Sequence, residues 1–477
     1  MLSMIMMSID MKWELKEMMD SLISAPKYHL ALEGCLLMCL LWLIFHKSYK
    51  PEASKLTEKE KEDLINEWTP EPLVPETPAD HYALNPRIVT SKLGKRIVVD
   101  GTDCLNLATH NYLGFVENDR CIESAIKGLR KYGVGSCGPR GFYGTVDIHL
   151  ELESRLAKFM GVEEAVLYSY GFSAISSAIP AYSKVGDLIF VDEGVNFAIQ
   201  QGLLASRSKI KFFKHNDVED LHRLLSEQAD IDRKNPKKAK VTRRFLVVEG
   251  LYINYGDICP LPQILELKKK YKVRMFIDDT CGFGVLGANG RGVVEHFGVD
   301  VADIDMICAT LENSMAAYGG FCCGTSFIVD HQRLSGLGYC FSASLPPLQA
   351  AVALSSLDTI ERDNSVIEKL RQNCQIMHSL LKNIPHIAVF GQTISPVKHL
   401  RFANQNGDHK LVTHKLEKVV TYAQERGYAL TVSRYLDQSE HLLPEPSIRL
   451  IVNAILTEQE MKASALMIGQ SFEFVLN

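Results

Sequence analysis

The stretch RFLVVEGLYINYGDICPLPQILELKKKYKVRMFID, residues 244–278, decides the fold class. It begins and ends with short apolar runs, RFLVVE and RMFID, which are typical of buried strands. Similar runs precede it along the chain: AVLYS at 165, LIFV at 188 and IKFF at 210. Helix-like segments lie among them, including Asp147–Met160 and Asn216–Glu227, the second opening with an Asn cap. This alternation predicts an α/β fold with a mostly parallel sheet, in which a ligand binds beyond the carboxyl ends of the strands.

Composition along the chain predicts five parts. Residues 1–26 are an amphipathic segment, residues 27–50 a membrane anchor, and residues 51–79 a charged helix (Leu56–Trp68) followed by a Pro-rich linker. Residues 80–355 are the large α/β domain, and residues 356–477 a smaller C-terminal α/β domain. Within the first part, Asp10–Ile23 is expected either to lie on a bilayer or to form a plain soluble helix.

The predicted anchor is LALEGCLLMCLLWLIF, residues 30–45, which is apolar except for Glu33. As a helix it falls a little short of a hydrocarbon core of about 30 Å. The alternative is a buried core helix. Five lysines follow the run and favour a cytosolic side after it, so we expect a single-pass anchor with the main domain in the cytosol: Lys47, Lys50, Lys55, Lys59 and Lys61.

Charge and cysteine usage argue against several classes of protein. The chain has 52 Lys and Arg against 57 Asp and Glu, a net charge of -5, which provides no general attraction to nucleic acid. Its 12 cysteines include no CxxC pair, so neither a zinc site nor a disulfide framework is predicted. Free thiols suit a reducing compartment around the folded part.

Several segments after residue 110 carry residues suited to a cofactor site. One is the loop GVGSCGPRGFYG at 133–144, which contains Cys137 and Arg140. Another is YSYGFSAISSA at 168–178, where a strand ending at Tyr168 turns through Gly171 into a helix whose amides could hold a phosphate. The remaining segments are MFIDDTCGFGVLGANGRG at 275–292, TLENSMAAYGG at 310–320, CFSASLPP at 340–347 and PSIRLIVNA at 446–454.

Together these segments resemble the α-oxoamine synthases, which are pyridoxal-phosphate enzymes of fold type I, and most closely the serine palmitoyltransferases among them. The resemblance implies that Asp278 pairs with the pyridine nitrogen and that Gly171 belongs to a phosphate cup. It also implies that Cys137, Arg140 and Tyr168 lie at a cleft shared with a partner. By the same resemblance, Ser342 and Ser344 are the candidates for a hydroxyl that reaches the partner's cofactor phosphate.

The sequence departs from the family pattern at three site positions. Asn313 stands where the family has the lysine that forms the aldimine, and an amide nitrogen is not a usable nucleophile. Cys281 and Phe197 stand where the family has two histidines. Arg449 corresponds to an arginine that holds the substrate carboxylate, but here we expect a structural salt bridge. The sequence therefore predicts no catalytic residue and no metal ligand in this chain.

The resemblance implies a lysine-lacking subunit of serine palmitoyltransferase in the endoplasmic reticulum membrane. Its partner would be the lysine-bearing catalytic subunit, which binds pyridoxal phosphate covalently, and small activating and regulatory membrane subunits would also be compatible with it. One alternative is a non-enzymatic membrane scaffold that binds regulators or lipid. Another is an independent enzyme that binds pyridoxal phosphate without a covalent link.

Overall fold

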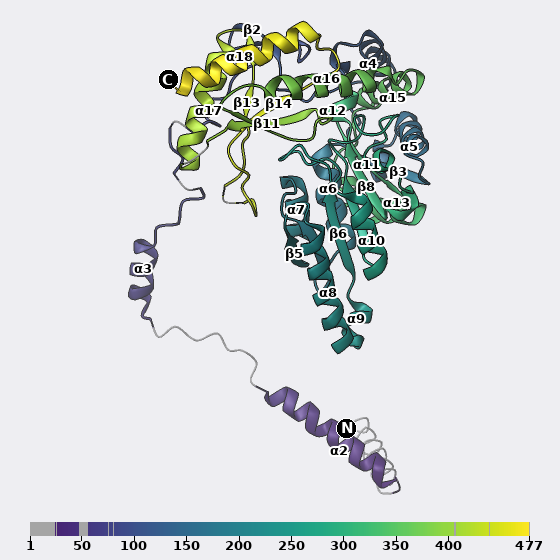
Figure 1. Cartoon of the computed structure of the whole chain (residues 1–477). Coiled ribbons are helices and arrows are strands. Elements are labelled where there is room, and N and C mark those ends of the chain that lie inside the picture. Colours follow the sequence, from purple (N-terminus) through teal and green to yellow (C-terminus); the bar gives the residue numbers. More distant parts are fainter. Residues whose placement is uncertain are drawn as a thin grey trace. The chain divides into compact units, whose positions relative to one another are not determined.

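The computed structural model describes residues 24, 26–46, 56–74, 76–79, 81–404, 407–437 and 439–476. Contacts divide the chain into two units, Met1–Asn85 and Pro86–Asn477, both drawn in Figure 1. The amphipathic helix predicted over Asp10–Ile23 lies outside the described residues.

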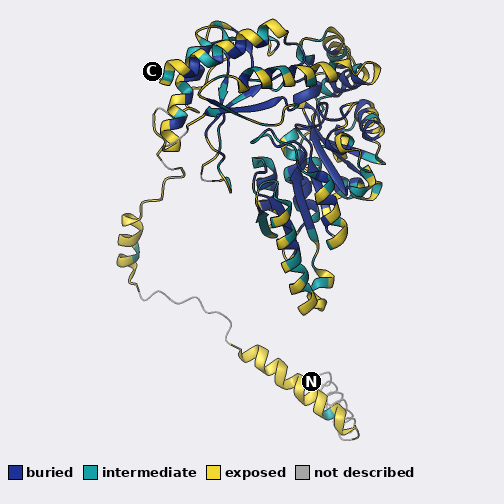
Figure 2. Cartoon of the chain, in the orientation of Figure 1, coloured by how far each residue is buried: buried dark blue, intermediate teal, exposed yellow. Residues whose placement is uncertain are grey.

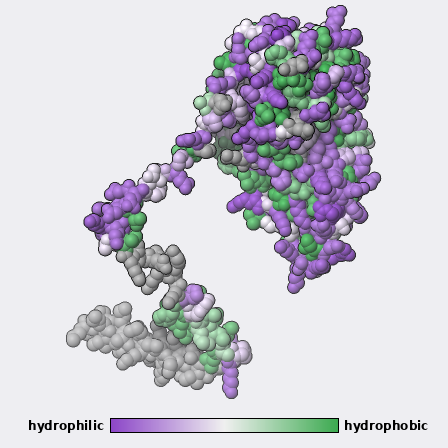
Figure 3. All heavy atoms as spheres, turned by 60° about the vertical axis from the view of Figure 1, so that its left-hand side comes forward, coloured by the Kyte–Doolittle hydropathy of each residue, from purple (hydrophilic) through white to green (hydrophobic). Residues whose placement is uncertain are grey.

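The first unit contains one apolar helix, α2 (Lys27–Phe45), that could cross a membrane by its length and composition. Its most apolar window of 18 residues has a mean hydropathy of 1.8, and no residue of the helix is buried, which argues against the alternative of a buried core helix. At about 1.5 Å per residue the helix is roughly 28 Å long, close to the hydrocarbon thickness of a bilayer. Figure 2 shows the helix as almost wholly exposed, and Figure 3 shows its apolar surface.

The charged helix predicted after the anchor is present as α3 (Glu58–Glu67). Thr57 and Glu60 form a capping box: the Thr57 hydroxyl accepts the Glu60 amide, and the Glu60 carboxylate accepts the Thr57 amide at 2.7 Å. No residue of α3 is buried.

A seven-stranded sheet forms the centre of the second unit, in the order β3-β9-β8-β7-β6-β4-β5. Strands β8, β7, β6, β4 and β5 pair in parallel, while β9 is antiparallel to both of its neighbours. The mostly parallel sheet that the sequence predicts is therefore confirmed. The strands are β3 (Glu164–Tyr168), β4 (Leu188–Asp192), β5 (Lys209–Phe213), β6 (Arg244–Glu249), β7 (Arg274–Asp278), β8 (Met306–Thr310) and β9 (Gly320–Gly324).

Helices cover this sheet and leave its central strands without solvent contact. Every residue of β4, β8 and β9 is buried, as expected for strands covered on both faces, and Figure 2 shows these strands dark between half-exposed helices. The α-helices up to residue 362 are α4 (Asp119–Tyr132), α5 (Asp147–Met160), α6 (Gly171–Tyr182), α7 (Phe197–Ser206), α8 (Val218–Lys234), α9 (Pro236–Val241), α10 (Leu261–Tyr271), α11 (Val293–Phe297), α12 (Glu312–Met315), α13 (Ser326–Ser335), α14 (Leu337–Cys340) and α15 (Pro347–Arg362). Shorter helical turns are η1 (Phe115–Glu117), η2 (Arg140–Gly144) and η3 (Val301–Asp303).

The C-terminal residues form a second, antiparallel sheet in the order β10-β11-β14-β13. A third sheet joins distant parts of the chain, because β12 pairs in parallel with β2, which also pairs with β1. The strands are β1 (Arg96–Val99), β2 (Thr102–Asn106), β10 (Ile387–Phe390), β11 (Val397–Phe402), β12 (Tyr428–Ala429), β13 (Thr431–Val432) and β14 (Ile448–Ile451). The helices here are α16 (Ser365–Lys382), α17 (His409–Gln424) and α18 (Glu458–Leu476).

The five predicted strands are all confirmed, and α5 has the predicted bounds. The predicted Asn cap at residue 216 is wrong. Asn216 has a left-handed φ of 53°, and α8 is instead capped by Asp217, whose side chain accepts the Asp220 amide at 2.9 Å. The division at residue 355 stays a prediction, and α15 is continuous across it.

Candidate functional site

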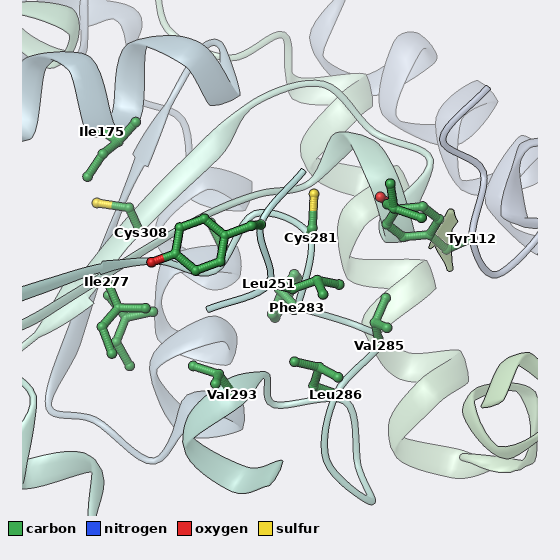
Figure 4. Close-up of a cluster of buried hydrophobic side chains, with 14 of the residues drawn as sticks. Tyr112, Ile175, Leu251, Ile277, Cys281, Phe283, Val285, Leu286, Val293 and Cys308 are labelled. Atoms are coloured by element: carbon green, nitrogen blue, oxygen red, sulfur yellow. The ribbon is translucent and has the colours of Figure 1, made fainter. Parts of the chain in front are cut away.

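A pocket of about 410 Å³ lies at the carboxyl ends of β6, β7 and β8, where an α/β sheet is expected to bind its ligand. The first turns of α6 and α7 contribute to it, and so does a loop after β13 that contains Tyr435 and Glu440. Its lining residue Cys281 also belongs to the buried apolar cluster of Figure 4, together with Phe283, Leu251 and Tyr112. The pocket therefore adjoins the packed apolar core at Cys281.

Two buried carboxylates share one asparagine at the strand ends. Asp278 closes β7, and its carboxylate accepts the Asn196 side-chain amide at 2.9 Å and the Thr280 hydroxyl at 2.5 Å. Glu249 closes β6 and accepts the backbone amide of Asn196 at 2.6 Å. Burial raises the pKa of Asp278, although its hydrogen bonds oppose the rise. Burial, together with the nearby Asp278 charge, holds the pKa of Glu249 well above its usual value. The pair can hold a proton or a cationic group.

Asn313 and Cys281 lie beside this pair and point to each other. The Asn313 side-chain nitrogen donates to the Thr280 carbonyl at 3.2 Å and lies 4.0 Å from the Cys281 sulfur. Burial raises the pKa of the Cys281 thiol, so it stays protonated at neutral pH. These two positions supply weak neutral donors and no amine.

Two aromatic rings lie at the starts of α6 and α7. Phe197 is half-buried in the pocket wall, and its ring centroid is 6.2 Å from that of Phe172 at the start of α6. Both side chains line the pocket. A phenyl ring offers a stacking surface and no proton exchange.

The first turn of α6 is already occupied by a carboxylate of the chain itself. The backbone amide of Gly171 donates to Oε1 of Glu312 at 3.1 Å. Gly171 and Glu312 both line the pocket, and the role of Gly171 in a phosphate cup stays a prediction. The Glu312 contact was not predicted, because it joins residues 141 positions apart.

Basic groups line the pocket from the N-terminal and C-terminal parts of the unit. Arg434 and Arg449 contribute guanidinium groups, and His110 contributes an imidazole whose Nδ1 lies 2.8 Å from the Tyr112 hydroxyl. Burial, helped by nearby positive charge, lowers the pKa of His110 to about 3, so this ring is neutral at physiological pH. Sequence analysis missed His110, Glu249 and Asn196, although Glu249 lies in the VVEG segment at a strand end, where such residues are sought.

The structure therefore gathers Gly171, Phe197, Asp278, Cys281, Asn313 and Arg449 in one pocket, and places five other predicted site residues outside it. Arg140 is buried and forms a bidentate pair with Glu153, at 2.7 and 3.0 Å. Tyr168 is buried and donates to Gln332 at 2.5 Å. The other three, Cys137, Ser342 and Ser344, lie in two loop segments. For all five, a contact with a partner stays a prediction.

Comparison with known proteins agrees with this arrangement. The aminotransferase class I and II family matches residues 102–466. "Long chain base biosynthesis protein 1b" of Oryza sativa subsp. japonica is 42% identical over 437 residues, which cover 91% of this chain and 89% of that protein. "Serine palmitoyltransferase 1" of Dictyostelium discoideum is 39% identical over 470 residues, which cover 96% of each. This chain belongs to the serine palmitoyltransferase 1 family, within the class I and II aminotransferases.

Solved structures support the serine palmitoyltransferase fold. A serine palmitoyltransferase from S. paucimobilis with a bound PLP-myriocin aldimine superposes with a TM-score of 0.73 at 26% identity, covering 82% of this chain and 93% of that one. A second structure, of SPT with a PLP internal aldimine, gives the same TM-score and coverage at 25% identity. The fold is therefore that of the PLP-dependent transferases.

The pocket fits only part of pyridoxal phosphate. Buried Asp278 is suited to the pyridine nitrogen. The Asn313 amide lines the pocket where the resemblance implies the aldehyde, and the cations that line the pocket are arginines, with no lysine among the lining residues that the structure describes. At Gly171, where the resemblance implies a phosphate cup, the backbone amide already donates to Glu312. The residues of this serine palmitoyltransferase 1 family member thus do not fit the complete cofactor.

Proposed function

We propose that this chain is the lysine-lacking subunit of a heteromeric serine palmitoyltransferase. The complex condenses L-serine with palmitoyl-CoA to 3-ketosphinganine, in the first step of sphingolipid biosynthesis. The observation that carries the proposal is Asn313, an amide in a pocket whose other nitrogen bases are guanidinium groups and one neutral imidazole. Since neither an amide nor a guanidinium serves as an amine nucleophile, the reactive lysine must come from a partner chain.

In this proposal the partner is the lysine-bearing catalytic subunit, which binds pyridoxal phosphate covalently. This chain stabilises it, anchors it in the endoplasmic reticulum membrane through α2, and places the main domain in the cytosol. An anchor suits the chemistry, because a long-chain acyl-CoA and its lipid product partition toward a bilayer. The names of the similar proteins, serine palmitoyltransferase 1 and long chain base biosynthesis protein 1, support the assignment.

Two segments that we propose to face the partner are joined on one surface. The Ser344 amide donates to the Gly138 carbonyl at 2.9 Å, and its hydroxyl donates to the Gly144 carbonyl at 2.5 Å. Ser342 donates to the Gly338 carbonyl. The two Ser344 bonds fix the loop that contains exposed Cys137 against the CFSASLPP segment.

Large apolar side chains stand out from the same two segments. Phe142 is 68% exposed, Tyr143 is fully exposed and Phe341 is 77% exposed. Tyr143 also has a left-handed φ of 63°. Exposed aromatic residues on a fixed loop are typical of protein interfaces, which supports a contact with the catalytic subunit here.

Co-expression with a lysine-bearing homologue tests the proposal. We expect the two chains to purify together, the pair to form 3-ketosphinganine, and each chain alone to form none. After borohydride reduction, mass spectrometry should find the pyridoxyl adduct on the partner and none on this chain. A reduced adduct on this chain, with product formed in isolation, would contradict the proposal.

The alternative of a non-enzymatic scaffold is favoured by one observation: Arg140 and Ser344 both use their side chains within this chain. Cys137→Ala and Ser344→Ala, compared with Leu466→Ala on an exposed face of α18, separate the two functions. A cleft role predicts altered turnover or amino-acid selectivity in an intact complex for the first two variants alone. Unchanged kinetics in all three would favour the scaffold.

A further inference from the structure

We infer that the Glu312 carboxylate is a built-in anion that occupies the phosphate-accepting end of α6, so that this chain's own pocket rejects phosphorylated ligands. This goes beyond the proposed function, which depends on a missing amine at residue 313. It concerns the start of α6, where Glu312 meets the Gly171 amide, and makes a separate statement about binding.

The contact replaces a helix cap. Tyr170, the residue before α6, gives no side-chain cap, and the Gly171 amide donates to Glu312 at 3.1 Å. A helix N-terminus carries partial positive charge and unpaired amides, which attract either a phosphate or a carboxylate. Glu312 supplies that negative charge from within the chain.

The backbone around Glu312 is fixed against α6. The Glu312 amide donates to the Thr310 hydroxyl at 3.2 Å, and this hydroxyl donates to the Gly319 carbonyl at 3.1 Å. Thr310 lies so close to Gly171 that a Cβ atom there would be 2.3 Å from its Oγ1. Because β8 and α6 approach this closely, the exposed Glu312 side chain lies within hydrogen-bond reach of the helix start.

The groups around the pocket carry charges of both signs, so the repulsion by Glu312 is local to the start of α6. A phosphate dianion placed at the Gly171 amide would face Glu312 directly, because the Glu312 carboxylate already accepts that amide. Arg434 and Arg449 offer opposite charge, and Glu440 offers a further carboxylate. Two like charges about 4 Å apart near a protein surface repel strongly enough to lower affinity about tenfold or more.

Equilibrium binding to the full-length chain in detergent tests this inference. The probes are pyridoxine 5′-phosphate and pyridoxine, which lack an aldehyde and so do not react with lysines. We expect wild-type protein to bind both equally weakly. Glu312→Ser should bind the phosphate ester about tenfold more tightly than wild type, with pyridoxine unchanged, and Glu312→Gln should show a smaller gain.

Glu163→Ser is the matched control. Glu163 also accepts a backbone amide at a helix start, that of Ser326 at 2.7 Å in α13, but it lies outside this pocket. We expect this control to bind like wild type. A gain in the control equal to that of Glu312→Ser would overturn the inference.

The inference also fails if wild-type protein prefers the phosphate ester tenfold, or if Glu312→Ser shows no gain. Should Glu312→Ser not fold, Glu312→Gln decides, because it keeps the size and removes the charge: an affinity gain below about twofold overturns the inference. As a second measurement, 50 mM inorganic phosphate should raise the melting temperature of the variant more than that of wild type. None of these readouts requires turnover, so failure here is distinct from failure of the proposed function.

Discussion

Arg140 illustrates at the residue scale how burial determines what a side chain does. Its side chain is 4% exposed and that of Glu153 is 6% exposed, and Glu153 also accepts the Leu167 amide at 2.9 Å. Removing one member of such a pair leaves an uncompensated buried charge. We expect Arg140→Ala to lower the free energy of unfolding by about 3–5 kcal/mol, measured by urea denaturation.

Arg155→Ala is the control for this prediction. Arg155 pairs with Asp358 and Glu361 in positions that are one-third to one-half exposed, so its loss should cost below about 1 kcal/mol. Equal losses in the two variants would show that the Arg140 pair does not stabilise the fold in the way its burial indicates.

The surroundings of His215 make us expect that the free energy of unfolding depends on pH. Its Nδ1 lies 2.8 Å from Asp192 and its Nε2 3.0 Å from Asp257, and its ring stacks on Tyr255 with centroids 4.1 Å apart. Burial lowers the pKa of His215, but hydrogen bonds to the two carboxylates outweigh it and raise the pKa to about 10. A raised folded pKa gives stability that is complete below about pH 6.5 and is lost as pH rises toward 10.

His215→Gln should therefore lower stability most near pH 6, with the difference from wild type shrinking by roughly 3 kcal/mol at pH 9. Urea denaturation at both pH values measures it. His414→Gln, at an exposed position of α17, should show no such trend. A constant difference between pH 6 and pH 9 for His215→Gln would contradict the assigned pKa.

The residues of the candidate site could be predicted where they lie in short sequence motifs. Asp278, Cys281 and Asn313 lie in two quoted segments, and the structure brings them together. The partner of Arg140 and the contact of Glu312 were not predictable, because each depends on which side chain reaches a given atom after folding. Glu312 and Gly171 are 141 residues apart in the sequence, so no local sequence pattern could predict their contact.

At the scale of elements, α2 allows a direct test of the anchor. Its residues Leu37 and Leu40 are 61% and 56% exposed in an uncharged stretch. An arginine near the centre of a membrane helix costs about 2.5–3.5 kcal/mol on insertion scales. We expect the double variant Leu37→Arg, Leu40→Arg to leave the membrane pellet after carbonate extraction.

The control for the anchor is Leu466→Arg, which is 66% exposed on α18 and should stay in the pellet. Retention of the double variant in the pellet would show that another part of the chain holds it there.

Strands of the seven-stranded sheet whose residues have high β-propensity were predicted, and those with low β-propensity were not. The β-rich runs at 165, 188, 210, 244 and 274 became β3 to β7. Strands β8 and β9 were missed, because MICAT and GFCCG contain Ala, Gly and Cys in place of a β-branched run, and their burial in the sheet centre overrides that low propensity. The predicted cap of α8 was one residue too early, at Asn216 in place of Asp217. Asn and Asp are both good helix caps, and only the backbone angles of the folded chain show which of the two residues is the cap.

At the scale of the whole molecule, long-range pairing was beyond sequence reasoning. The antiparallel position of β9 between β3 and β8, and the pairing of β2 with β12 across more than 300 residues, follow from tertiary packing. The predicted parallel α/β class is unaffected, because five adjacent strands still run in parallel.

The division of contacts at Asn85 and Pro86 gives a prediction for the whole chain. Neither α2 nor α3 buries a residue, so deleting residues 1–85 should remove membrane binding and leave the unfolding free energy of the remainder within about 1 kcal/mol of the full-length value. By contrast, deletion of α18 would expose the core contacts of Met461, Ile468 and Phe472 and should prevent folding. Urea denaturation and calorimetry of both truncations measure this. A shortened chain 86–477 that melts far below the full-length protein would show that the N-terminal unit stabilises the fold, and that the anchor and the transferase domain are one cooperative structure.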